Sequence, residues 1–396
     1  MLTELLTVKE ISPLFLGTFK FIIYMKIVYI VASIIPSRTA NSVHVMKMCQ
    51  AFASNGHEVD LLIPGKVDKS IKTEDIYDFY GVKKCFKIIR IPSLKFKVGL
   101  LFFTFLASLK AKKKNPDLVY TRFLYAAFIS LFFGLPTVYE IHTSFEKRLE
   151  KTFFYLMNKN KLKKIVVISN SLRDHFVNKY KIDERNIFIA PDGADSVKTG
   201  FSSKKVKKDS SKIAIGYVGN LYKGRGIDII AKIAERCHWA EFHIIGGYPN
   251  DVDYWSNKLS NLKNVIFYGY VPHRDVNEYI LSFDALIAPY QKRVTVQGRG
   301  DICQWMSPLK IFEYMAAGKA ILSSDLSVLK DVFEHGNNSL LASPENIDEW
   351  VSNLELIKKD IQFRNKLGEN AKKDFENKYT WKSRANNILK SLILKT

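Results

Sequence analysis

The segment from Ser307 to Asp325 reads SPLKIFEYMAAGKAILSSD and carries the strongest local signal in the chain. It predicts a loop that opens a helix, a turn at Gly318 and a buried strand. Ser307 and Pro308 are typical of a helix cap and first turn. The exposed amides of such a helix start, including that of Leu309, attract phosphate together with the helix dipole.

Lys310 lies in the first turn of this helix, where the dipole disfavours a cation unless an anion compensates it. We therefore expect Lys310 to neutralise a bound diphosphate. Glu313, about one turn later on the same face, is expected to accept hydrogen bonds from a ribose. The alternative is an ordinary amphipathic helix with both side chains in solvent.

A second candidate phosphate loop is GYVGNLYKGRGID, from Gly216 to Asp228. Gly219 allows a close approach of the backbone, Asn220 follows it, and Lys223 and Arg225 bring cations to the carboxyl end of a strand. The spacing is neither a Walker motif nor a G-x-G-x-x-G fingerprint. A basic strand-to-helix turn is therefore the alternative.

Two further strands, in HIIGGY (243–248) and VIFYGYVP (265–272), end in glycine or aromatic turns. Such turns suit a flat base held through backbone groups, here around Gly247 and Val271.

Outward from these motifs, short β-branched runs alternate with longer helical patterns, which indicates βαβ units and parallel sheets. The predicted strands are 26–32, 58–63, 118–120, 137–141, 165–168, 187–190, 213–218, 242–245, 265–267, 285–288, 320–323 and 339–341. A polar, lysine-rich stretch at 196–212 separates two groups. We predict two doubly wound units, at 25–195 and 213–375, that face each other across a cleft. The tail at 376–396 is predicted to be a helix, following a bend, that returns to the first unit.

The first unit offers its own cleft residues. VYEIHTSF (138–145) places Glu140 and His142 at a strand end, on the same side because strand side chains alternate. His142 is the candidate for the reacting centre, with a structural histidine as the alternative. The turn after the first strand is expected to face the cleft with four more polar residues: Thr39, Asn41, Ser42 and His44.

The chain has 396 residues, 47% of them hydrophobic and 25% charged, which excludes disordered and multi-span membrane classes. Its net charge is +21, with an excess of +14 in residues 1–200 (31 basic, 17 acidic) and +7 in the rest (29 and 22). This asymmetry predicts that the first half faces an anionic partner. Four dispersed cysteines indicate neither a disulfide framework nor a zinc site and favour a reducing cytoplasm.

Lys20 and Lys26 interrupt the apolar stretch at 14–36, so we do not predict a spanning helix there. Residues 1–24 are either an upstream extension or a loosely attached amphipathic arm. The apolar runs 98–109 and 123–135 are too short to span a bilayer. Because lysines flank the first run, an interfacial helix resting on anionic lipid and a core helix with solvated lysine ends both remain open.

Taken together and in this order, these motifs resemble family 4 glycosyltransferases of the GT-B fold over most of residues 26–390. ANSVHVMKMCQAFASNGHEVDLL (40–62) is similar to the opening βαβ unit of that family, and IVVISNSLRDHF (165–176) and IAPDGAD (189–195) resemble the segments that close its first domain. The 216–228 and 307–321 segments resemble its donor-binding signatures.

The resemblance implies a nucleotide-diphosphate sugar held by the second domain and an acceptor held by the first. Arg225 and Lys310 would contact the diphosphate, Glu313 the ribose, and Gly219 the pyrophosphate. His142 would lie near the donor sugar. No bound metal is implied.

The chain departs from the family pattern at two positions. Many members have a second glutamate eight positions before the one matching Glu313, where this chain has Trp305. Asp301 is the candidate substitute for that glutamate. Many members also have arginine where this chain has Asn220.

The expected activity is therefore a retaining sugar transfer, with attack by the acceptor on the same face as the departing diphosphate. The basic first half favours a lipid-linked glycan acceptor, surface polysaccharide assembly and a cytoplasmic enzyme peripheral on the inner face of the membrane. The alternatives are a GT-B nucleotide-sugar epimerase and a non-catalytic membrane-surface protein. A nucleic-acid partner is not expected, since no aromatic platform accompanies the basic residues.

Overall fold

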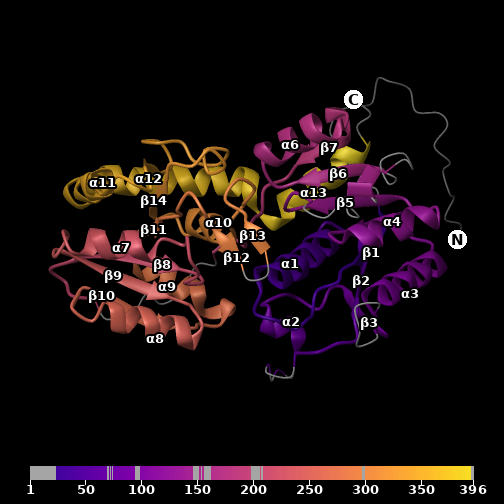
Figure 1. Cartoon of the computed structure of the whole chain (residues 1–396), viewed down its shortest axis with the longest axis horizontal. Helices are drawn as coiled ribbons and strands as arrows, with labels where there is room; N and C mark the ends of the chain where they lie inside the picture. Colours follow the sequence, from indigo (N-terminus) through magenta and orange to yellow (C-terminus); the bar gives the residue numbers. More distant parts are fainter. Residues whose placement is uncertain are drawn as a thin grey trace, which may run out of the picture.

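The computed structural model describes residues 24–68, 71, 73, 75–93, 99–145, 151–152, 154–155, 162–197, 206, 208–296 and 299–393. The chain forms two lobes, each a parallel sheet with helices on both faces (Figure 1). The predicted α/β class with two Rossmann-like units is therefore confirmed. The expectations for residues 1–23 and for most of 196–212 lie outside the described residues.

The first sheet has the strand order β3-β2-β1-β4-β5-β6-β7. Its strands are β1 (Lys26–Ile30), β2 (Glu58–Pro64), β3 (Lys87–Ile91), β4 (Leu118–Thr121), β5 (Thr137–Ile141), β6 (Lys164–Val167) and β7 (Ile187–Ile189). The central strands are buried along their whole length, as expected of a sheet covered on both faces. β3 was missed because this edge strand, KIIRI, is partly exposed and carries two basic residues.

The second sheet has the order β10-β9-β8-β11-β14-β15. Its strands are β8 (Ile213–Val218), β9 (Ala240–Ile245), β10 (Val265–Gly269), β11 (Ala285–Ala288), β14 (Ala320–Ser324) and β15 (Leu340–Ala342), and β12 (Thr295–Val296) and β13 (Arg299–Asp301) form a separate hairpin. Both sheets reverse their order beside the first strand of the lobe. Ligands of such sheets bind beyond the carboxyl ends of the strands at this reversal.

Helices cover both sheets. Those of the first lobe are α1 (Ala40–Ser54), α2 (Ile76–Phe79), α3 (Gly99–Lys114), α4 (Leu124–Phe132), α6 (Asn170–Tyr180) and η2 (Glu184–Asn186). Those that follow are α7 (Ile227–Ala234), α8 (Pro249–Lys258), η3 (His273–Asp275), α9 (Val276–Ser282), α10 (Leu309–Ala316), α11 (Ile347–Lys359), α12 (Ile361–Asp374), η4 (Phe375–Tyr379) and α13 (Trp381–Ile393).

The last helix, α13, lies against the first lobe although it follows the second in sequence (Figure 1). Trp381, Ala385, Ile388 and Leu389 are buried with α1 in the core under the first sheet. The chain thus crosses between the lobes twice, and residues from its end reach the first sheet.

Among the residues that the structure describes, no helix has both the length and the hydropathy needed to span a bilayer.

Candidate active site

Lys310 is buried in the first turn of α10. Its Nζ atom lies 3.7 Å from the centroid of the Tyr217 ring and 5.3 Å from that of Tyr290. The alternative with this side chain in solvent is therefore wrong. The predicted cap is also wrong: the helix has no side-chain cap, and Ser307 Oγ accepts the backbone N–H of Asp192 in the other lobe at 2.8 Å.

Arg225 reaches the same place from the loop after β8. Its guanidinium carbon lies 5.5 Å from the Tyr290 centroid, so both cations meet one aromatic ring. Burial holds the pKa of Lys310 well below its usual range, and the nearby Arg225 charge lowers it further. Lys310 Nζ and Arg225 Nε are buried without a hydrogen-bond partner in the described structure. Two adjacent cations, each with a buried donor atom that has no acceptor, form a site for an anion.

Gly219 is needed for this arrangement. Its φ is +146°, and a Cβ atom there would lie 2.7 Å from Lys310 Nζ. The neighbouring Asn220 contributes its carbonyl, which accepts the Tyr217 hydroxyl at 2.7 Å. Lys223, predicted beside the phosphate, is exposed and does not join the pair over Tyr290.

Glu313 lies one turn along α10 and accepts a hydrogen bond from His273 at 2.9 Å. Burial would raise the pKa of Glu313, but the hydrogen bond and charge of His273 bring it below its usual range. A cavity of about 200 Å³ between the lobes adjoins Glu313 and Lys47. Its other lining residues are Val43, Gly81, Gly193, Ala194, Asp195, Ser196, His273, Arg274, Asn277, Leu309 and Trp381.

Val271 and Gly247, the two residues predicted to hold a base, lie outside the cavity beside Glu313. Val271 is partly buried against the core of the second lobe. Gly247 has a φ of +91°, and a Cβ atom there would lie 2.7 Å from Leu221. Both follow strand ends, but neither lines the cavity beside Glu313.

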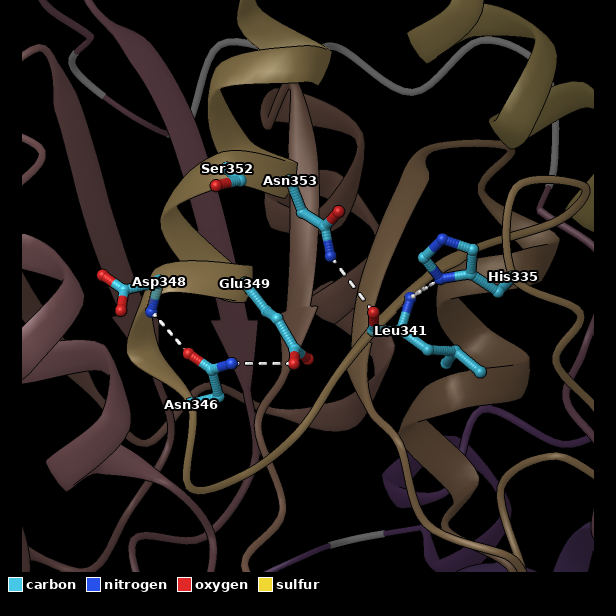
Figure 2. Close-up of a pocket in the computed structure, with 7 residues that line it drawn as sticks. All are labelled: His335, Leu341, Asn346, Asp348, Glu349, Ser352 and Asn353. Atoms are coloured by element: carbon cyan, nitrogen blue, oxygen red, sulfur yellow. Dashed lines mark hydrogen bonds between the residues drawn. The ribbon is translucent and has the colours of Figure 1, made fainter.

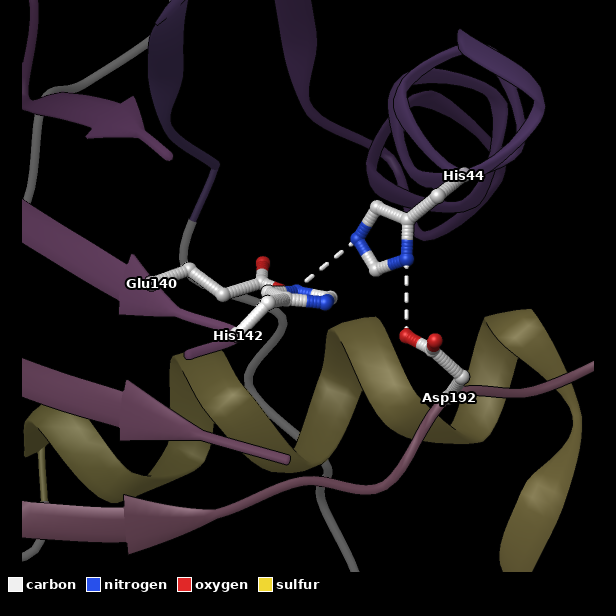
Figure 3. Close-up of side chains that lie close together, drawn as sticks. All are labelled: His44, Glu140, His142 and Asp192. Atoms are coloured by element: carbon white, nitrogen blue, oxygen red, sulfur yellow. Dashed lines mark hydrogen bonds and ion pairs between the residues drawn. The ribbon is translucent and has the colours of Figure 1, made fainter. Parts of the chain in front are cut away.

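In the first lobe, His142 follows β5 and hydrogen-bonds to Glu140 through Nε2 (Figure 3). The buried Glu140 also accepts hydrogen bonds from Tyr120 and, at 2.8 Å, from Arg384 of α13. His44 of α1 completes the group, with its Nε2 3.1 Å from Glu140 and its Nδ1 2.8 Å from Asp192. Glu140, the hydrogen-bond partner of His142, is thus itself held by side chains from β4, α1 and α13.

Electrostatics fixes the charges in this group. Burial, with a contribution from the Arg122 cation, lowers the pKa of His142 to about 4, so its ring is neutral near pH 7. Burial would raise the pKa of Glu140, but Arg384, His44 and His142 hold it well below its usual range. Asp192 is likewise buried, yet His44 brings its pKa to about 2. Both carboxylates are therefore ionised.

His44, Glu140, His142 and Asp192 each offer one ligand atom, and these atoms lie within 4.8 Å of one another. Imidazole and carboxylate are ligands that a divalent cation accepts. Here, however, Arg384 already supplies the positive charge at Glu140. We interpret the group as a self-satisfied network that orients His142.

The remaining predicted residues have structural roles. Asp301 accepts backbone N–H groups of Val294 and Cys303, which does not suit the proposed substitute for a sugar ligand. The Trp305 ring packs on His175 of the first lobe, with centroids 4.8 Å apart. At the start of α1, Thr39 is the cap and accepts the Ser42 N–H, and Asn41 donates to Ser33.

A second depression, of about 320 Å³, lies on the second lobe away from these groups (Figure 2). Its lining residues are His335, Leu341, Asn346, Asp348, Glu349, Ser352 and Asn353. They bond mainly to one another; for example, Asn353 donates to the Leu341 carbonyl, and Leu341 N–H donates to His335. We therefore place the functional site between the lobes.

Comparisons with known proteins identify the family. The family profile "Glycosyltransferase Family 4" matches residues 42–198, and "Glycosyl transferases group 1" matches residues 199–374. Two uncharacterized glycosyltransferases of Methanocaldococcus jannaschii are similar in sequence. MJ1607 is 22% identical over 86% of this chain and 90% of its own length, and MJ1069 is 24% identical over 77% and 74%.

Solved structures share the fold. Anabaena HepE in complex with UDP has a TM-score of 0.70 and 15% identity, covering 93% of this chain and 100% of that one. A glycosyltransferase from Rickettsia africae has a TM-score of 0.72 and 14% identity, covering 94% and 99%. The lipopolysaccharide outer core galactosyltransferase WaaB has a TM-score of 0.63 and 19% identity, covering 94% and 100%.

Proposed function

We propose, since the chain belongs to glycosyltransferase family 4, that it transfers a sugar with retention from a nucleotide-diphosphate sugar to a lipid-linked glycan. The observation that carries the proposal is that Lys310 Nζ and Arg225 Nε, two buried donor atoms without acceptors in the described structure, belong to cations that meet over Tyr290. When the bond between the anomeric carbon and the phosphate oxygen breaks, negative charge gathers on the diphosphate. Fixed cations placed where charge develops are usually the largest source of rate enhancement.

The hydrogen bonds around Glu140 in the first lobe bear on the route by which the acceptor attacks the donor sugar. Glu140 is the carboxylate beside His142, but it is held by Arg384 and Tyr120 and does not suit a nucleophile. We therefore propose that an acceptor hydroxyl attacks from the face that the diphosphate leaves. A carbon–oxygen bond forms to the acceptor, and the acceptor proton passes to the leaving phosphate oxygen. Neutral His142 would hydrogen-bond to the donor sugar.

Two protein cations at the diphosphate take the part that a metal ion plays in other transferases. We propose that transfer needs no divalent metal. The rate is expected to be unchanged in excess EDTA, and loss of turnover that Mg²⁺ or Mn²⁺ restores would contradict this.

The acceptor proposal rests on α3 at the surface of the first lobe. Leu100, Leu101, Phe102 and Phe105 are exposed on its first turns, and Lys110, Lys112 and Lys113 are exposed or partly exposed near its end. Apolar side chains beside lysines suit an anionic membrane surface, where a lipid-linked acceptor resides. The galactosyltransferase WaaB, similar in fold, is described as acting on the lipopolysaccharide outer core, in keeping with a role in surface polysaccharide assembly.

The membrane part has its own test, sedimentation with vesicles of phosphatidylglycerol and phosphatidylethanolamine. The double variant Leu101→Glu/Phe105→Glu is expected to lose binding. Ile361→Glu, at an exposed apolar residue of the second lobe, is the control and should bind as the wild type does. Equal sedimentation of all three proteins would remove the membrane surface from the proposal.

The catalytic part is tested with a panel of nucleotide sugars and polyprenyl-diphosphate acceptors, followed by mass spectrometry. Lys310→Ala is expected to lower turnover at least 100-fold with unchanged circular dichroism. Lys330→Ala, an exposed lysine paired with Asp325 in the same lobe, is the control. Near-normal turnover of Lys310→Ala at saturating donor would refute the assignment. An epimerised donor formed without acceptor would indicate the epimerase alternative instead.

A further inference from the structure

Arg122 is a cation of the first lobe that the proposed reaction does not yet use. It directly follows β4, at the carboxyl edge of the first sheet, two residues after Tyr120. Its charge acts on Tyr29 and on His142. Because β4 pairs in parallel with β5, Arg122 and His142 follow neighbouring strands at the same carboxyl edge of the first sheet.

The guanidinium of Arg122 lacks a matching anion. Its Nη1 atom is buried without a hydrogen-bond partner, and no ion pair of Arg122 with a carboxylate is found in the described parts of the chain. Among the lysines and arginines described, only Lys310 Nζ and Arg225 Nε share this combination of burial and missing partner. Arg122 as a whole is partly buried, so its buried Nη1 donor faces inward without an acceptor while the rest of the side chain stays within reach of a ligand.

Arg384, which also packs in the first lobe, is an arginine whose guanidinium has hydrogen-bond acceptors. Its guanidinium donates to Glu140 and to the carbonyls of Ala190 and Pro191. Two carboxylates of the lobe belong to the group around His142. Glu140 pairs with Arg384, and Asp192 pairs with His44. Neither carboxylate forms an ion pair with Arg122 in the described parts of the chain.

We propose that Arg122 binds a negatively charged group of the acceptor, a phosphate or a carboxylate, close to the hydroxyl that attacks the donor sugar. This inference rests on the proposed function. The donor diphosphate is matched by Lys310 and Arg225 from the second lobe, whereas Arg122 belongs to the first lobe and its charge reaches His142. A guanidinium presents a planar fork of donors that fits two oxygens of a phosphate or a carboxylate. The acceptor class is accordingly anionic, either a phosphate that links the glycan to its lipid or an acidic sugar.

The test uses the full-length protein with its donor site filled by whichever of UDP, ADP, GDP and CDP binds most tightly. Decyl phosphate represents a lipid-linked phosphate, methyl galacturonoside an acidic sugar, and decyl maltoside an uncharged lipid glycoside. Calorimetry is expected to detect binding of one of the two anionic probes. Arg122→Gln should weaken that binding at least tenfold, with Arg122→Lys between the two. Whichever anionic probe binds identifies the source of the charge.

The control variant is Arg185→Gln, which alters an exposed arginine of the same lobe that has its own partner, Asp183. It should bind both the nucleotide and the probe as the wild type does. Arg122→Gln should also keep the nucleotide affinity and circular dichroism of the wild type. This separates the inference from the proposed function, because absence of nucleotide binding by the wild type would count against the proposed function and not against Arg122 alone.

The inference is wrong if the wild type and Arg122→Gln bind the anionic probe equally. It is also wrong if the wild type binds only the uncharged probe, or no probe. A third contradicting result is that Arg122→Gln loses nucleotide affinity and nothing else. The last would place Arg122 in the donor site.

Discussion

Lys310 combines two properties that rarely coexist in a folded protein: a buried amine and, within the described part of the chain, no carboxylate partner. Tyr217 and Tyr290 provide ring faces, which attract a cation less strongly than a carboxylate does. Burial and Arg225 together depress its pKa. A bound diphosphate would reverse both effects, so the protonation of Lys310 should be coupled to donor binding.

This coupling predicts proton uptake. The free-state pKa of Lys310 is lowered, and the diphosphate raises it, so nucleotide affinity is full below the free-state pKa and falls as pH rises toward the bound-state pKa. Calorimetry in buffers of different ionisation enthalpy should show proton uptake on UDP binding at alkaline pH. Lys310→Arg, whose guanidinium stays charged, should lose that uptake. Proton release, or identical uptake by both proteins, would contradict the coupling.

Sequence reasoning proposed Lys310, Arg225 and His142 because each lies in a short motif at the end of a predicted strand or the start of a helix. It did not find Arg384, which meets Glu140 across 244 residues of sequence. A buried arginine on a helix with charged faces leaves no local pattern. Lys47, His273 and Asp192 were missed for the same reason, because their partners are distant in sequence or lie in the other lobe.

At the scale of elements, α13 contributes both an apolar face and one buried charge to the first lobe. The apolar residues pack on α1, and Arg384 binds Glu140 and two carbonyls beyond β7. The returning helix was predictable from its position after a break in the helical pattern. Its charged anchor was not, because only the folded lobe places Glu140 beneath it.

Arg384→Met is therefore expected to lower the free energy of unfolding by about 3–5 kcal/mol, because it leaves Glu140 buried without its strongest partner. Chemical denaturation is the measurement. Lys390→Met, at an exposed position of the same helix, is the control and should change stability by less than about 0.5 kcal/mol. Equal stability of the two variants would show that Glu140 does not depend on Arg384.

At the scale of the whole molecule, contacts at one rim join the lobes. Trp305 packs on His175, Ser307 accepts the N–H of Asp192, and the Asp331 carboxylate accepts two hydrogen bonds from Asn170 at 2.9 and 3.0 Å. Trp305 thus fills a contact between lobes at the position where many family members carry a glutamate. The sequence identified the departure, but its consequence needed both lobes in place.

Asp331→Ala is expected to loosen the lobes. Small-angle scattering should give a larger radius of gyration for this variant without nucleotide and the wild-type value with saturating nucleotide. Asp348→Ala, which removes a highly exposed carboxylate that pairs with Arg236, is the control. A scattering profile identical to the wild type in both states would exclude a role for the rim contact in holding the lobes.

The central claim is that Arg225 and Lys310 meet one diphosphate, and a double-mutant cycle of nucleotide affinity tests it most directly. Calorimetry would measure UDP binding, and that of ADP, GDP and CDP, to the wild type, Arg225→Ala, Lys310→Ala and the double variant. We predict a loss of at least tenfold in each single variant and a combined loss that differs from the product of the two, because the side chains share a ligand. Wild-type affinity in either correctly folded single variant, or strictly independent losses, would contradict the account.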